Sequence, residues 1–186
     1  MKQWLALFVL ALAAGTLGWF GGRWLSQHRG ETSVSMERPA DAGAADLVGS
    51  RRPDFALPGL DGQVRHIGEW QGKVILVNFW ATWCGPCREE MPMLQALQSE
   101  MGSKGLQVVG VALDQPDATQ RFAAKLGVQY PILVNDPMAE DISVRYGDDE
   151  GVLPYSVLVG RDGIVRDTFI GKLQRDRLRE AVGALL

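Results

Sequence analysis

Apolar and polar positions alternate along the chain in a pattern that predicts strands and helices in turn from Phe55 onward. Residues 55–67 hold two short apolar runs around a turn rich in Gly and Asp, which is typical of a β-hairpin. Residues 74–80 (VILVNFW) are apolar at every position except Asn78, as expected of a central strand covered on both faces. Apolar side chains then recur at helical spacing, which predicts a helix over 87–101.

The second half of the chain continues this alternation. The pattern predicts a buried strand over 106–113 and a helix between Pro116 and Gly127. Asp136 resembles a helix N-cap followed by proline at the first helical position, and so predicts a further helix. A second hairpin and a closing helix complete the chain: 155–159, 164–170 and the apolar positions Leu178, Val182 and Leu185. We therefore expect an α/β domain over 53–186.

The N-terminus has a different pattern. Between Lys2 and Arg23 lie 20 uncharged, mostly apolar residues, the length that spans about 30 Å of hydrocarbon as a helix. We expect residues 1–25 to be a membrane anchor. A cleaved secretory signal is the alternative, with Ala11 and Ala13 forming a small-x-small site, but the apolar run continues beyond that site and favours the anchor. Positive charge is nearly balanced across the segment, so it does not set the orientation.

Residues 26–52 combine Gly, Ser, Ala, Pro and balanced charges without apolar periodicity. This composition predicts a flexible linker with a root-mean-square span of roughly 25–30 Å. The whole chain of 186 residues then has room for one globular domain and this appendage. With 22 acidic and 19 basic residues it offers no large cationic surface, which argues against nucleic-acid binding.

The strongest chemical signal is the pair of cysteines, Cys84 and Cys87, between a buried strand and a helix. Unpaired N–H groups and the helix dipole should lower the pKa of Cys84, which makes it the nucleophile. Cys87 lies one turn further on the same side, where it can attack a mixed disulfide and release the substrate.

Two other interpretations of the pair are weaker. An inert disulfide would close a loop of four residues and gain little stability from loop entropy. A zinc site needs two further ligands, and His28 and His66 are the only histidines in the sequence. We therefore predict a redox-active disulfide, Cys84–Cys87, that needs no other cofactor.

The segment NFWATWCGPCREEMP, residues 78–92, resembles the active-site segment of TlpA/ResA-type thiol-disulfide oxidoreductases, which are membrane-anchored members of the thioredoxin superfamily. The similarity extends from about Arg52 to Leu186 and includes the segments 52–62 and 151–163. It implies a thioredoxin-like fold, in which helices flank a central mixed sheet, with an N-terminal hairpin extension and one inserted strand-helix unit. It also implies a catalytic domain in the periplasm, held to the bacterial inner membrane by a single span.

The resemblance assigns substrate contacts around the cysteines. Pro154 resembles the cis-proline that pairs with the backbone of an incoming substrate, and Leu153 precedes it where Thr or Val is commoner. Trp83 and Pro86 are implied to lie against the substrate beside Cys84. The acidic stretch 148–150 looks like a small insertion, and it bears on substrate preference.

Two polar residues allow different roles. Thioredoxin has a buried aspartate at the position of Asn78, and an amide cannot move a proton as that carboxyl does. Glu90 matches a functional glutamate in part of the family, and it lies three residues after Cys87, where a carboxylate raises the thiol pKa and can accept its proton. In the alternative, Glu89 and Glu90 are solvated acids that complement the helix dipole.

Three functions compete at this stage. The first is a reductant of disulfides in other extracytoplasmic proteins, re-reduced by a membrane electron donor of the DsbD or CcdA type. The second is a peroxiredoxin-like thiol peroxidase, since AhpC/TSA relatives share the segment 52–62, but Ala81 stands where such an enzyme has Thr or Ser. The third is a copper chaperone, which needs a late histidine, and none follows His66. The Gly-Pro dipeptide between the cysteines is that of thioredoxin, which favours the reductant. The substrate stays open among apocytochrome c, a folding catalyst and a cofactor-assembly protein.

Overall fold

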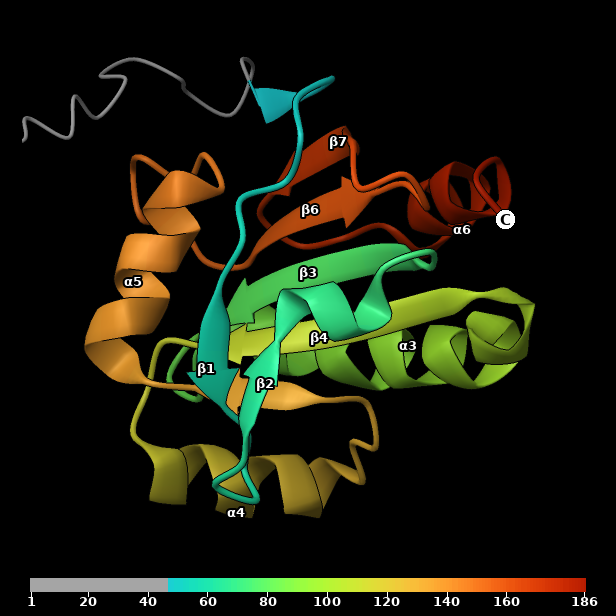
Figure 1. The fold of residues 1–186 in the computed structure, drawn as a ribbon. Coiled ribbons are helices and arrows are strands. Elements are labelled where there is room, and N and C mark those ends of the chain that lie inside the picture. The colour runs from blue at the N-terminus through green and yellow to red at the C-terminus, as the bar shows by residue number, and fades with distance from the viewer. Residues whose placement is uncertain (1–46) are drawn as a thin grey trace, which may run out of the picture. The chain divides into compact units, whose positions relative to one another are not determined.

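The computed structural model describes residues 47–186 (Figure 1). The predicted anchor and most of the predicted linker lie outside the described residues. Within residues 47–186, no helix combines the length and the apolar character that a bilayer span requires.

A five-stranded sheet forms the centre of the domain, in the order β5-β4-β3-β6-β7. The strand β3 runs parallel to β4 on one side and antiparallel to β6 on the other, so the sheet is mixed, as predicted. Every residue of β3 and β4 is buried, which explains why both were readable as continuous apolar runs. The strands are β3 (Val74–Trp80), β4 (Leu106–Ala112), β5 (Ile132–Val134), β6 (Tyr155–Val159) and β7 (Val165–Ile170).

Helices cover both faces of this sheet (Figure 1). Alternate residues of β3 point to opposite faces, which separates two apolar cores. Trp80 belongs to the core that holds α3, α4 and α6, whereas Phe79 belongs to the core that holds α5 and the N-terminal hairpin. The helices are α3 (Gly85–Met101), α4 (Pro116–Leu126), α5 (Asp136–Arg145) and α6 (Arg175–Gly183), and two short 3₁₀ helices, η1 (Ile67–Trp70) and η2 (Gly102–Lys104), follow β2 and α3.

The N-terminal hairpin is present, and a further unit lies between β4 and α5. The hairpin pairs β1 (Ala56–Pro58) with β2 (Val64–His66) in an antiparallel two-stranded sheet. This unit is α4 followed by β5, and β5 extends the central sheet at its edge by pairing with β4. We did not predict β5 from the sequence because three residues are too short a run to show a period.

Two boundaries differ from the sequence-based expectation. The N-cap of α5 is Asn135, and its side chain does not cap the helix, so the prediction of Asp136 at this position is wrong by one residue. Residues at the end of the expected linker bond to the domain, because the N–H of Gly49 donates to the Val165 carbonyl and that of Arg52 to the Gly163 carbonyl, each at 2.9 Å.

Candidate active site

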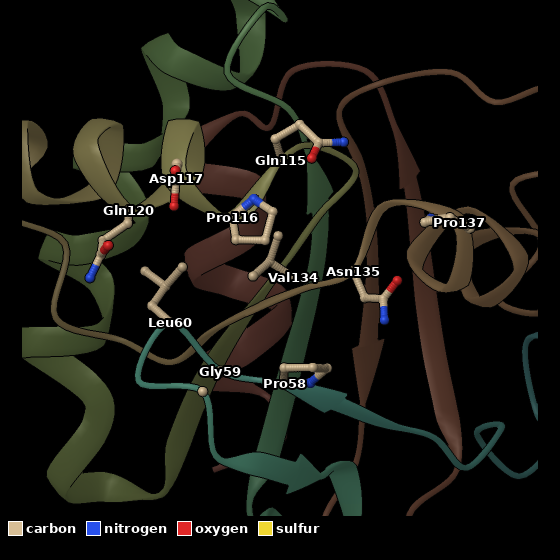
Figure 2. Close-up of a pocket in the computed structure, with 11 residues that line it drawn as sticks. Pro58, Gly59, Leu60, Gln115, Pro116, Asp117, Gln120, Val134, Asn135 and Pro137 are labelled. Carbon is tan, nitrogen blue, oxygen red and sulfur yellow. The ribbon is translucent and has the colours of Figure 1, made fainter.

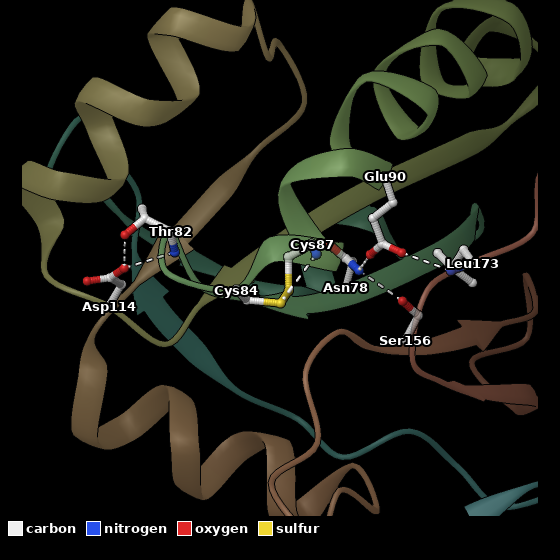
Figure 3. Close-up of a disulfide and its surroundings, with 8 residues drawn as sticks. All are labelled: Asn78, Thr82, Cys84, Cys87, Glu90, Asp114, Ser156 and Leu173. Carbon is white, nitrogen blue, oxygen red and sulfur yellow. Dashed lines mark hydrogen bonds between the residues drawn. A yellow bond between two sulfur atoms is a disulfide. The ribbon is translucent and has the colours of Figure 1, made fainter.

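The two cysteines form a disulfide at the start of α3, directly after the loop that follows β3 (Figure 3). The S–S distance is 2.01 Å and the Cα atoms are 5.3 Å apart. Cys84 is the N-cap of the helix, with extended backbone, and its Sγ accepts a hydrogen bond from the Cys87 N–H at 3.3 Å. The sulfur predicted to be the nucleophile therefore lies where unpaired N–H groups and the helix dipole favour negative charge.

The two cysteines differ in how far each residue is exposed. Cys87 is fully buried, whereas Cys84 keeps 5% of its surface exposed. The neighbours of Cys84 are open: Trp83 is 69% exposed and Pro86 is exposed as well. Trp80, by contrast, is completely buried, as the sequence predicted for a core residue. A partner molecule reaches Cys84 first.

A buried carboxyl lies one helical turn beyond Cys87. Glu90 is 1% exposed and accepts hydrogen bonds from the Asn78 amide at 2.8 Å and from the Leu173 N–H at 2.9 Å (Figure 3). Burial raises the pKa of Glu90 above its ordinary value, while these two hydrogen bonds oppose the increase. The idea that Glu90 is a solvated acid is therefore wrong, although it holds for Glu89, which is exposed and pairs with Lys172.

Asn78 links the Glu90 carboxyl to β6, which lies beside β3 in the sheet. Its amide donates to Glu90 and, at 2.9 Å, to the hydroxyl of Ser156, which stands opposite Asn78 in the β3–β6 pairing. The Asn78 Oδ1 and the Tyr130 hydroxyl are buried without a hydrogen-bond partner in the described part of the chain. Burial, and after it the negative charge of Glu90, raises the pKa of Tyr130. Glu90 thus belongs to a polar cluster inside an apolar core.

Sequence reasoning missed several members of this site. Ser156 carries the only recognisable signal, since it is the one polar residue in the run YSVLV. Leu173 contributes through its backbone, and Tyr130 lies in an irregular segment, so neither has a sequence signature. Thr82 is a further case: its N–H and hydroxyl both donate to Asp114 Oδ2, which ties the loop before Cys84 to the end of β4 (Figure 3).

Two of the residues expected to touch a substrate, Leu153 and Trp83, come together in the structure. The Leu153–Pro154 peptide bond is cis, and Pro154 is buried directly before β6. Leu153 and Trp83 both line a hollow of about 460 Å³. A second hollow of similar volume lies between the β1–β2 turn and the starts of α4 and α5, and its lining contains no cysteine (Figure 2).

A CxxC disulfide at the N-terminus of the helix that follows a central strand, in a mixed sheet with helices on both faces, is the arrangement of a thioredoxin-like thiol-disulfide oxidoreductase. Among residues 47–186, no group of three or more His, Cys, Asp or Glu side chains is placed to hold a metal ion. The sequence model of the Redoxin family matches residues 47–185, and the chain belongs to this family.

Individual relatives agree with that assignment. The thiol-disulfide oxidoreductase ResA of Geobacillus thermodenitrificans is 30% identical over 137 residues, which cover 73% of this chain and 76% of the relative. The thioredoxin-like protein YneN of Bacillus subtilis is 29% identical over 184 residues, or 97% of this chain and 96% of the relative.

Solved structures give the same result. A Chlorobium tepidum crystal structure assigned as the thiol:disulfide interchange protein DsbE matches with a TM-score of 0.68 and 32% identity, covering 74% of this chain and 96% of that chain. A second thiol:disulfide interchange protein of that organism has a TM-score of 0.66 and 27% identity, over 74% of this chain and 96% of that chain. The predicted fold class and the predicted oxidoreductase activity are confirmed.

Proposed function

We propose that this protein reduces disulfides in other extracytoplasmic proteins, with Cys84 as the attacking thiolate and Cys87 as the resolving thiol. The observation that carries the proposal is the difference between the two sulfurs: Cys84 lies at the helix N-terminus with open neighbours, and Cys87 is fully buried. The Cys84 thiolate attacks one sulfur of the substrate disulfide and releases the other as a thiolate. Cys87 then attacks Cys84, which frees the second substrate thiolate and transfers two electrons in total.

Glu90 has the properties of a proton acceptor for the second step. Cys87 must lose its proton before it attacks, and no solvent reaches it directly because it is fully buried. A carboxyl whose pKa burial has raised is closer in proton affinity to a thiol than an ordinary glutamate is, so the transfer costs less free energy. We therefore include Glu90 in the catalytic set.

The finer parts of the proposal rest on the sequence. The proposed substrate contacts are Trp83 and Pro86 beside Cys84 in the chain, and Leu153 and Pro154 at the cis peptide bond before β6. The apolar segment within residues 1–25 supports an inner-membrane anchor that leaves the domain in the periplasm. In that oxidising compartment the reduced pair needs a steady electron supply, so we propose a membrane donor of the DsbD or CcdA type.

The peroxidase alternative has no comparable support. Ala81 stands three residues before Cys84, where a peroxidatic loop needs a hydroxyl. The two relatives described above are named as a thiol-disulfide oxidoreductase and a thioredoxin-like protein.

Single cysteine variants test the assignment of roles. Cys84→Ser should abolish reduction of insulin disulfides, because no attacking thiolate remains. Cys87→Ser should attack once and accumulate mixed disulfides with substrate proteins, visible on non-reducing gels and identifiable by mass spectrometry. Equal trapping by both variants would contradict the assignment of roles, and rapid peroxide consumption by the parent chain would favour the peroxidase.

A further inference from the structure

We propose that the hollow beside the disulfide is a substrate subsite that selects a cationic polypeptide segment, with Lys or Arg close to the reacting cysteine. We call it the acidic hollow. This inference rests on the proposed function, because it names the class of protein substrate that Cys84 attacks.

The charge of the lining is one-sided. Five carboxylates surround a volume of about 460 Å³, and no Lys or Arg is among the described residues that line it. One of them lies after β4, one is in α5, and three are consecutive in the loop between α5 and β6: Asp114, Glu140, Asp148, Asp149 and Glu150. A bound segment of positive charge would be attracted into the hollow, and an acidic one repelled.

The residues that directly precede Cys84 and Pro154 in the chain belong to the lining of the hollow. Trp83, which precedes Cys84, and Leu153, which precedes Pro154, both line it. Trp83 is 69% exposed and Val144 is 39% exposed, so apolar surface is open to contact beside the carboxylates. Apolar surface next to charge suits the long Lys and Arg side chains, whose methylene stems pack on apolar groups while their heads meet the carboxylates.

Asp148 provides independent evidence that a ligand belongs here. Its side chain is buried, with 4% of the residue exposed, and its Oδ1 accepts a hydrogen bond from the Val152 N–H at 2.8 Å. Its Oδ2 has no hydrogen-bond partner among the described residues. A buried carboxylate oxygen without a donor is costly, and a guanidinium or ammonium group supplies the donor and the opposite charge together.

The surroundings of Asp148 increase this cost. Burial raises the pKa of Asp148, and the negative charges of Asp149 and Glu150 raise it further, while backbone N–H groups of Val152 and Gly151 act in the opposite direction. A cation in the hollow would act on Asp148 in the opposite direction, because its charge favours the carboxylate. Arg fits better than Lys, since its planar fork can engage two carboxylates at once.

Two matched disulfide peptides test the proposal with the full chain in detergent solution. They carry the same cystine, flanked in one by Arg and in the other by Glu, with a Gln peptide as the neutral reference. We expect kcat/KM for the Arg peptide to exceed that for the Glu peptide by roughly three- to tenfold, the size expected of one or two exposed charge pairs. Most of the difference should lie in KM, and added salt should reduce it.

Charge removal then locates the effect. Asp149→Asn combined with Glu150→Gln should remove most of the preference and leave kcat/KM for the Gln peptide unchanged, because both residues are exposed. Asp148→Asn should act in the same direction. The control is Asp176→Asn combined with Glu180→Gln on α6, which removes the same charge from exposed positions outside the hollow.

The outcomes separate this inference from the proposed function. Equal rates with the Arg and Glu peptides, or a preference that survives Asp149→Asn/Glu150→Gln, would overturn the acidic hollow as a selective subsite. Equal loss in the α6 control would overturn it too, because the effect would then come from net charge. Failure to reduce any of the peptides or insulin would instead overturn the proposed function.

Discussion

At the scale of residues, the site depends on one buried carboxyl, Glu90, whose proton affinity differs from that of an exposed glutamate. Glu89, one position earlier, provides the comparison: it is exposed, and its ion pair with Lys172 lowers its pKa. Burial acts in the opposite sense on Glu90 and raises its pKa. Two neighbouring glutamates in one helical turn therefore have different proton affinities because one faces the core and the other faces water.

Glu90→Gln should slow the resolving step by roughly a hundredfold, the low end of what a general base contributes. It should leave the initial attack by Cys84 nearly unchanged and should lower the pKa of the Cys87 thiol, because a negative charge is removed. Rapid mixing with a fluorescent disulfide and thiol alkylation against pH would measure these quantities. Glu89→Gln is the matched control, and identical kinetics in the two variants would leave Glu90 with a structural role only.

The same variant gives a second readout in stability. A carboxyl whose pKa is raised in the folded state keeps its proton there while the unfolded chain ionises near 4.5. Its contribution to stability is therefore fully present below that pH and is lost as the pH rises through the folded pKa. Urea unfolding of the oxidised parent protein should show this decline, and Glu90→Gln should lack it. Parallel pH profiles for the two proteins would argue against a raised pKa.

At the scale of elements, the contact between β4 and its neighbours depends on a glycine. Gly110 stands between Asn78 of β3 and Ile132 of β5 in the sheet. A Cβ placed on it would lie 3.1 Å from the Trp80 Nε1 and 3.4 Å from both Ile132 and Tyr130. Any side chain at position 110 would therefore crowd the contact between β4 and its two neighbouring strands, β3 and β5.

Gly110→Ala should lower the free energy of unfolding by about 1–3 kcal/mol, the usual cost of overpacking a filled core. Gly183→Ala near the end of α6 is the control, since nothing lies within 4 Å of a Cβ there. Alanine in a helix should leave stability unchanged or raise it by up to about 1 kcal/mol. Urea unfolding of both variants measures the difference, and equal stabilities would show that the core around Gly110 accommodates a methyl group.

The elements also show how far sequence reasoning reaches. The strands β3 and β4 were predictable because a central strand buried on both faces leaves a nearly continuous apolar run, and β6 was predictable as one arm of a hairpin. The cysteine pair was predictable from its spacing. The strand β5 and the polar cluster around Glu90 were not, because they depend on which residues the sheet places side by side. Ser156 is chemically meaningful only through its register with Asn78.

At the scale of the whole molecule, the domain holds both of its cores within the described residues. Leu47 is buried in one of them, and Gly49 and Arg52 bond to the carbonyls of Val165 and Gly163. A chain that starts a few residues before Leu47 should therefore keep every contact that the structure describes. A chain that starts at Pro53 loses the contacts made by Leu47, Gly49 and Arg52, and it should therefore unfold at a lower temperature.

Fractionation tests this together with the proposed anchor. The full chain should remain with the membrane, and the chain that starts just before Leu47 should be soluble and should reduce insulin as the full chain does. A full chain recovered in the soluble fraction, or a mature N-terminus near Ala14, would contradict the anchor. Inactivity of the shorter chain would show that the N-terminal segment contributes to more than location.

Asp114 contacts the loop before Cys84 and also lines the acidic hollow. Its Oδ2 accepts both donors of Thr82 in the loop before Cys84, and its side chain lines the acidic hollow. By thermodynamic reciprocity, a bound segment that shifts the balance between the dithiol and the disulfide must have a different affinity for the oxidised and the reduced protein, by the same factor. In an oxidoreductase with this coupling, oxidation of the cysteine pair lowers the affinity for the bound polypeptide. The reduced product is then released because the reaction has occurred, and not through dilution alone.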